Sequence, residues 1–212
     1  MDLIELLQIG LAIAALFALV LLIAQLWRTA RTGRKLSYAP PSGSERMGVW
    51  YAFTTGMMPS SKESVRKHIP TFIAGILYHL AIAGSGAFLL LAELGFDQVS
   101  SVLWTIRICV FAGLFAGVAL LVKRLAFAKM RIISTPDDYL SNFSVDLFLA
   151  TTIVTTFLAE WLPVLYVVTI MLLVYIPVGK IRHCVFFFYT RVLFGRLFGS
   201  RGVLPQPVRE RR

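Results

Sequence analysis

Hydrophobic positions in this chain gather in five long blocks separated by short polar stretches. An α-helix rises about 1.5 Å per residue, so about 20 apolar residues cross a hydrocarbon core of roughly 30 Å. The fifth block is interrupted by Lys180 and Arg182, but apolar character resumes after them and extends the expected helix. The pattern predicts an all-α integral membrane protein built as a bundle of five transmembrane helices. The expected helices cover about residues 6–27, 69–94, 102–122, 143–159 and 162–190.

The composition agrees with this prediction. Of the 212 residues, 58% are hydrophobic and 15% are charged, with a mean hydropathy of +0.76. A soluble domain of this size needs far more polar surface. The first block carries Asp2 and Glu5 in place of a positive n-region, and no small-residue cleavage site precedes Trp27. We therefore interpret it as a retained helix and not as a signal peptide.

The net charge of +10 is distributed unevenly along the chain. If the first helix runs from outside to inside, 20 of the 21 basic residues fall in inner segments, and Arg107 is the exception. This positive-inside pattern predicts an outer N-terminus and a cytoplasmic C-terminus in the cytoplasmic (inner) membrane. We expect one membrane domain over 1–200 and a basic cytoplasmic tail over 201–212. The charge is explained by topology, so we expect no nucleic-acid partner.

Two cysteines, Cys109 and Cys184, lie far apart in the sequence, with no CxxC spacing. The chain is therefore not expected to bind an iron–sulfur cluster or a zinc ion of its own. On the third helix, Gly113 and Gly117 form a GxxxG pair, which indicates close helix packing.

His79 is the ionisable residue that stands out in the second block. It lies roughly 16 Å along the helix axis from the start of the block. Gly75, Ala83 and Gly86 lie four residues before, four after and seven after it, on the same face. A smooth wall with one imidazole suits the approach of a flat macrocycle, and Gly75 and Gly86 would then line the cofactor. A stripe of small residues is also typical of helix–helix packing, so both interpretations stand.

A six-coordinate haem b needs a second axial ligand on another helix at a similar depth. In a continuous fifth helix, His183 lies roughly 12 Å from the inner boundary, and His79 lies roughly 18 Å from it. The predicted haem iron is therefore ligated by His79 and His183. With three histidines in the chain, a second bis-histidine haem has no ligand pair.

Other polar residues near the inner boundary are candidates for supporting roles. Arg124 and Arg182 can pair with haem propionates, and His68, Asp146 and Lys180 are candidates for a quinone site. Each also has a simpler interpretation, because cations anchor helix ends to lipid and both His68 and Asp146 can be interfacial residues.

Three segments together suggest a family. They are Gly-Ile-Leu-Tyr-His-Leu, which contains Tyr78 and His79, the run from Tyr175 to His183, and Leu120–Arg124 followed by Arg131, Thr135 and Asp138. With five helices and an outer N-terminus, the chain resembles the gamma (cytochrome b) subunit of respiratory nitrate reductase. It is more similar still to the membrane cytochrome subunits of heterodisulfide reductase and of complexes linked to dissimilatory sulfite reductase.

This resemblance implies a cofactor and a partner. In the nitrate reductase subunit, helices two and five each supply two histidines for two haems, and His79 and His183 match the inner pair. Leu89 and Leu165 stand where the outer pair is expected, which implies a single haem. Family members pass electrons between a membrane quinone, menaquinone or ubiquinone, and a cytoplasmic iron–sulfur subunit. A heterodisulfide-reductase-like or ferredoxin-like partner would dock on the basic segment Phe194–Arg212.

The main hypothesis is therefore a haem b electron-transfer subunit of an oxidoreductase complex, non-catalytic or quinone-reactive, with no catalytic residue of its own. The alternative is a haem-free membrane anchor for a soluble redox enzyme. A small transporter ranks last, because the pattern indicates neither inverted repeats nor a broken helix.

Overall fold

The computed structural model describes residues 2–32, 39–61, 63–95 and 100–204. These residues form helices and connecting turns, with no strand among them. Most of the expected tail, residues 205–212, lies outside the described residues. Several charged residues used for the predicted orientation do so as well, namely Arg34, Lys35, Lys62, Asp97, Arg209, Arg211 and Arg212.

The chain divides into two compact units where a single membrane domain was expected. The first unit comprises Met1–Leu21 and Pro70–Ile181, and the second comprises Leu22–Ile69 and Arg182–Arg212. The long helices are α1 (Leu3–Arg31), α4 (Ile69–Glu93), α5 (Ser100–Ala126), α7 (Pro136–Phe157), α8 (Leu162–Tyr175) and α9 (His183–Ser200). The short helices are α2 (Glu45–Phe53), α3 (Glu63–Arg66) and α6 (Ala128–Ile133), and 3-10 turns occur at η1 (Thr55–Met57), η2 (Pro59–Ser61), η3 (Ala159–Trp161) and η4 (Lys180–Arg182).

Within the described residues, four helices are long and apolar enough to cross a membrane: α1, α4, α5 and α7. A fifth span exists only if α8 and α9 are counted as one broken span. The all-helical prediction is thus confirmed, and several long apolar helices are compatible with a multi-pass membrane protein. The fourth helix begins at Pro136, earlier than the expected residue 143, because Thr135 N–H donates to Asp138 Oδ2 at 2.8 Å and starts the helix there.

The prediction of one continuous fifth helix over 162–190 is wrong. Helix α8 ends at Tyr175 and α9 begins at His183. Pro177 lacks a backbone N–H and its ring disfavours helix continuation. A Cβ on Gly179 would overlap the Tyr175 ring, which folds back onto this turn. The turn is therefore built around a glycine and the Tyr175 side chain.

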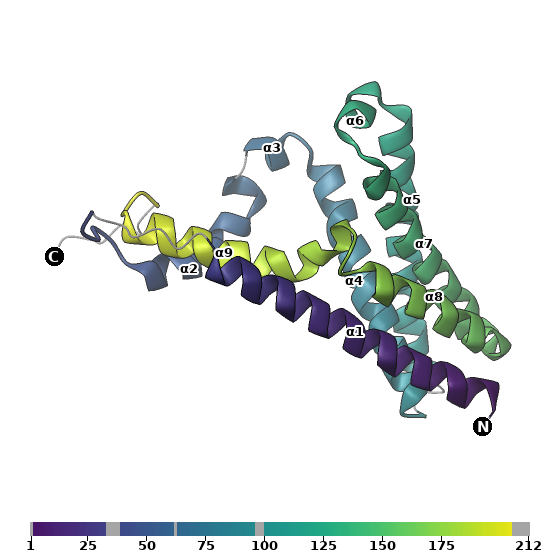
Figure 1. Cartoon of the computed structure of the whole chain (residues 1–212). Helices are drawn as coiled ribbons and strands as arrows, with labels where there is room; N and C mark the ends of the chain where they lie inside the picture. The colour runs from purple at the N-terminus through teal and green to yellow at the C-terminus, as the bar shows by residue number, and fades with distance from the viewer. Residues whose placement is uncertain (1, 33–38, 62, 96–99, 205–212) are drawn as a thin grey trace. The chain divides into compact units, whose positions relative to one another are not determined.

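The first unit has its core between α4, α5, α7 and α8, with α5 packed along α7 (Figure 1). Gly113 and Gly117 both lie at close helix contacts, as the GxxxG pair predicts. A Cβ on Gly113 would overlap Ala81 of α4, and one on Gly117 would overlap Tyr78 of α4 and Asp146 of α7. The largest side chains that are fully buried include Tyr166, Leu149, Leu165 and Val110.

The second unit is held together by backbone-to-backbone contact between α2 and α9 (Figure 1). A Cβ on Gly48 would overlap the carbonyl oxygen of Gly195, and one on Gly199 would lie 2.8 Å from Gly48 Cα. At the end of this contact, Ser42 N–H donates to Ser200 O at 2.8 Å. Glycines are required here because any side chain would push the two helices apart.

The α2–α9 contact generates a stability prediction. Replacing Gly48 by Ala inserts a methyl group against the Gly195 carbonyl, and we expect a loss of about 1–3 kcal/mol in the free energy of unfolding of this unit. Thermal unfolding in detergent, with limited proteolysis of residues 39–61, measures it. Gly84→Ala is the control, since its Cβ would lie at ordinary contact distance, 3.6 Å from Val110 Cγ2. Equal stability of the two variants would contradict the contact.

Candidate functional site

His79 lies on an exposed face of α4, and its ring is oriented by the helix backbone. Its Nδ1 is 2.7 Å from the carbonyl oxygen of Gly75, one turn earlier. A carbonyl only accepts, so Nδ1 carries the proton and donates, and in the neutral ring the lone pair is on Nε2. Metal-ligating histidines commonly donate their other ring nitrogen to a backbone carbonyl in this way.

The small residues around His79 form an open face. A Cβ built on Gly75 or on Gly86 meets no atom of the described chain within 4 Å, apart from the helix's own neighbouring backbone. Ala83 on the same face is exposed, whereas Ala81, Ser85 and Phe88 on the other face are buried. Within the first unit, no described side chain therefore fills the space beside Gly75 and Gly86, which leaves room for a flat ligand.

The other two histidines belong to the second unit. His183 is the first residue of α9 and is exposed. His68 is also exposed and lies directly before α4, and its backbone N–H donates to Val65 O at 2.9 Å. The depth match between His79 and His183 assumed a continuous fifth helix, and the break between α8 and α9 removes that argument. Their pairing at one iron stays a prediction.

Asp146 is part of a buried polar cluster of α4, α5 and α7. Its side chain is 7% exposed, and Asn142 Nδ2 donates to its Oδ2 at 3.0 Å. Tyr78 Oη donates to the Asn142 carbonyl at 3.1 Å, and Asn142 Nδ2 lies 3.3 Å from Gly117 O. A carboxyl this enclosed is not open to a quinone. The sequence interpretation missed Asn142, although its spacing of four residues from Asp146 puts both on one helix face.

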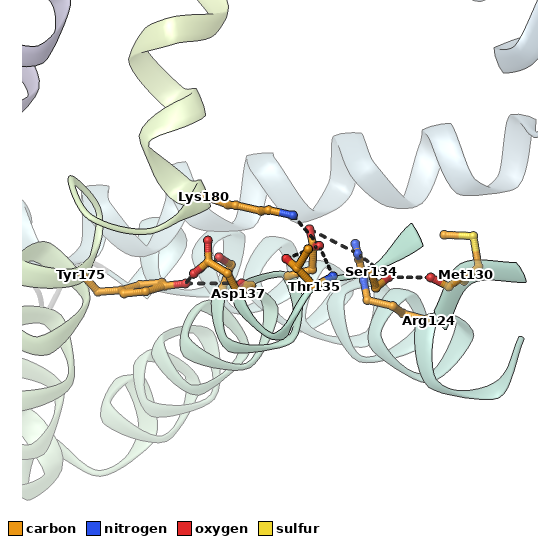
Figure 2. A network of polar contacts seen from close by, with 9 residues as sticks. Arg124, Met130, Ser134, Thr135, Asp137, Tyr175 and Lys180 are labelled. Carbon is orange, nitrogen blue, oxygen red and sulfur yellow. Dashed lines mark hydrogen bonds and ion pairs between the residues drawn. The ribbon is translucent and has the colours of Figure 1, made fainter. Parts of the chain in front are cut away.

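Arg124 and Lys180 meet at one carboxylate at the start of α7 (Figure 2). Lys180 Nζ forms an ion pair with Asp138 Oδ2, and Arg124 Nη1 lies 3.4 Å from Asp138 Oδ1. Arg124 Nη1 also donates to Ser134 Oγ at 3.1 Å. The structure thus brings together one residue predicted for propionate binding and one predicted for the quinone site. Asp138, which joins them, is not among the predicted site residues.

The neighbouring carboxylate, Asp137, holds the end of α8. Tyr175 Oη donates to Asp137 Oδ1 and lies 2.9 Å from Ser141 Oγ (Figure 2). The same tyrosine ring packs on Gly179. The start of α7 therefore fixes the turn that follows α8.

Arg182, the second predicted propionate residue, lines an open groove in the second unit. The groove has a volume of about 460 Å³ and is also lined by Gln25, Arg28, Thr29 and Phe186. Two guanidinium groups and no carboxylate line it, which suits an anion.

Arg107 has a structural role, because it contacts the end of α7. Its guanidinium donates to the carbonyl of Thr156, and it lies 4.0 Å from the Phe157 ring centroid. It thus joins α5 to the end of α7. Among the described residues, no group of three or more His, Cys, Asp or Glu side chains is arranged to hold a metal ion.

The shared carboxylate generates a prediction. Asp138→Asn removes the charge that faces both Lys180 and Arg124, and we expect a loss of about 1–2 kcal/mol in unfolding free energy, because the carboxylate is largely shielded from water. Thermal unfolding in detergent measures this loss. Glu63→Gln is the control. The Glu63 side chain is 81% exposed and that of its ion-pair partner Lys67 is 68% exposed, so this pair contributes little to the unfolding free energy. An unchanged midpoint for Asp138→Asn would contradict a structural role.

Comparisons with known proteins leave the family unassigned. No family model matches the chain, and no curated protein or solved structure matches it. The resemblance to nitrate-reductase-type cytochromes stays a prediction from the residues.

Proposed function

We propose that this protein is a membrane electron-transfer subunit that carries one haem b and exchanges electrons between a membrane quinone and a cytoplasmic iron–sulfur subunit. The observation that carries the proposal is the open face of α4. There His79, oriented by its hydrogen bond to Gly75 O, stands between glycines whose missing side chains leave space.

The residues of this face fit a haem. The plane of the macrocycle needs a helix surface without bulky side chains, and Gly75 and Gly86 supply it. The iron needs an imidazole whose second nitrogen is held, and the Nδ1 bond to Gly75 O holds it. His183 of the second unit is the proposed second ligand. When bound, the haem supplies one-electron transfer, while the protein holds the imidazoles and excludes water.

The charge distribution supports a cytoplasmic partner. The described residues of the second unit include nine basic and two acidic side chains, against six basic and seven acidic in the first. By the positive-inside rule the second unit belongs at the cytoplasmic side, and the N-terminus outside. A cationic surface there favours docking of an acidic iron–sulfur protein.

Among the three quinone-site candidates, the structure favours His68. Asp146 is buried and Lys180 is paired with Asp138, whereas His68 is exposed at the start of α4. An imidazole there can hydrogen-bond the carbonyl of menaquinone or ubiquinone.

The haem proposal has a direct spectroscopic test. We expect purified protein to show a b-type reduced-minus-oxidised spectrum with one haem per chain. His79→Ala and His183→Ala should each lose most of it, because each removes an axial ligand. His68→Ala is the matched control and should keep the haem. Absence of b-type absorption in the unchanged protein, or full haem content in both ligand variants, would refute the proposal.

The haem-free anchor is the second candidate, and the break between α8 and α9 favours it, because that break removes the depth match of the two histidines. The two functions differ in one preparation. If the protein is an anchor, the soluble redox partner co-purifies with it and the preparation shows no Soret band. If it is the electron-transfer subunit, the partner co-purifies and the Soret band is present.

A further inference from the structure

The C-terminal end of α1 and the start of α9 form a groove in the second unit. Arg28 and Arg182 line it, together with Gln25, Thr29 and Phe186. Thr29 Oγ1 donates to Gln25 O at 2.9 Å, a bond that fixes this turn of α1. The groove thus brings together the guanidinium groups of Arg28 and Arg182, which are more than 150 positions apart in the sequence, and the ring of Phe186.

The charge of the groove indicates an anionic occupant. The lining includes no Asp or Glu, and the described side chains of the whole unit have nine basic residues against two acidic ones. Guanidinium groups recognise phosphate through paired, charge-assisted hydrogen bonds.

The position of the groove along the chain indicates the source of that anion. Arg28 directly follows the apolar span of α1, where Trp27 is 54% exposed and Ile23 is 56% exposed. Arg31 lies over the Trp27 ring, 3.6 Å from its centroid. A tryptophan followed by arginines marks the membrane–water boundary, where lipid phosphates lie.

We propose that Arg28 and Arg182 bind the headgroup phosphate of an anionic phospholipid of the inner leaflet. A lipid is favoured over an acidic protein because Arg28 lies directly after the apolar span of α1, at the level along that helix where lipid phosphates lie. The site goes beyond the proposed electron transfer and rests only on the chain spanning a membrane.

This assignment competes with the expected role of Arg182 at a haem propionate. If Arg182 serves the lipid, its loss leaves the haem content unchanged. If it serves the haem, its loss lowers haem content and leaves lipid binding intact. The two measurements on one variant therefore separate the two roles.

The test is a titration of delipidated protein in detergent with phosphatidylglycerol and, separately, with phosphatidylcholine, followed by native mass spectrometry. We expect the unchanged protein to prefer phosphatidylglycerol. The Arg28→Gln/Arg182→Gln double variant should bind it roughly tenfold more weakly, because two charge-assisted contacts are lost. The control is Arg46→Gln/Arg196→Gln, which removes the same charge from a different groove of the same unit. This control should bind phosphatidylglycerol as the unchanged protein does.

Three results would overturn the proposal. The first is that the Arg28→Gln/Arg182→Gln variant binds phosphatidylglycerol as tightly as the unchanged protein does. The second is that both double variants bind it equally weakly, which would indicate an effect of net charge alone. The third is that loss of Arg182 lowers the haem content without weakening lipid binding. The titration is repeated on the His79→Ala chain, because lipid binding there is expected whether or not the chain binds haem.

Discussion

The start of α7 carries two adjacent carboxylates, and the arrangement of the first unit depends on their contacts. Asp138 faces Lys180 and Arg124, so it joins the end of α5 to the segment after α8. Asp137 accepts from Tyr175, whose ring covers Gly179. Charges at the end of an apolar helix are costly unless paired, and here the pairing also ends α8 and begins the turn.

The turn after α8 has a consequence for the rest of the molecule. Because the helix does not continue, α9 is available to pack on α2 through glycines and forms a separate compact unit with it. The first unit contains α4, α5, α7, the first part of α1 and the buried cluster around Asp146, and the second contains most of the described basic residues. Net positive charge is thus concentrated in the second unit, whose described side chains include nine basic and two acidic residues.

The open face of α4 and the arginine groove follow the same principle. In each, a polar side chain bonds to its own helix: His79 Nδ1 donates to Gly75 O, and Thr29 Oγ1 donates to Gln25 O. The His79 ring is held in orientation by its local bond, so a ligand need not organise it on arrival. The two surfaces differ in chemistry, since one offers an imidazole beside glycines and the other offers the guanidinium groups of Arg28 and Arg182.

The sequence by itself determined the helical class and the extent of α1, α4 and α5 to within a few residues, because helix length and apolar composition are local properties. It also identified His79 with its stripe of small residues, since their spacing follows from the helical period. It did not determine the end of α8. Pro177 and Gly179 are tolerated in many membrane helices, and here the break depends on Tyr175 reaching Asp137, 38 residues earlier. The contact of Gly48 with Gly195 and the meeting of Arg28 with Arg182 were likewise decided by tertiary structure, because nothing in the local sequence specifies a neighbour about 150 residues away.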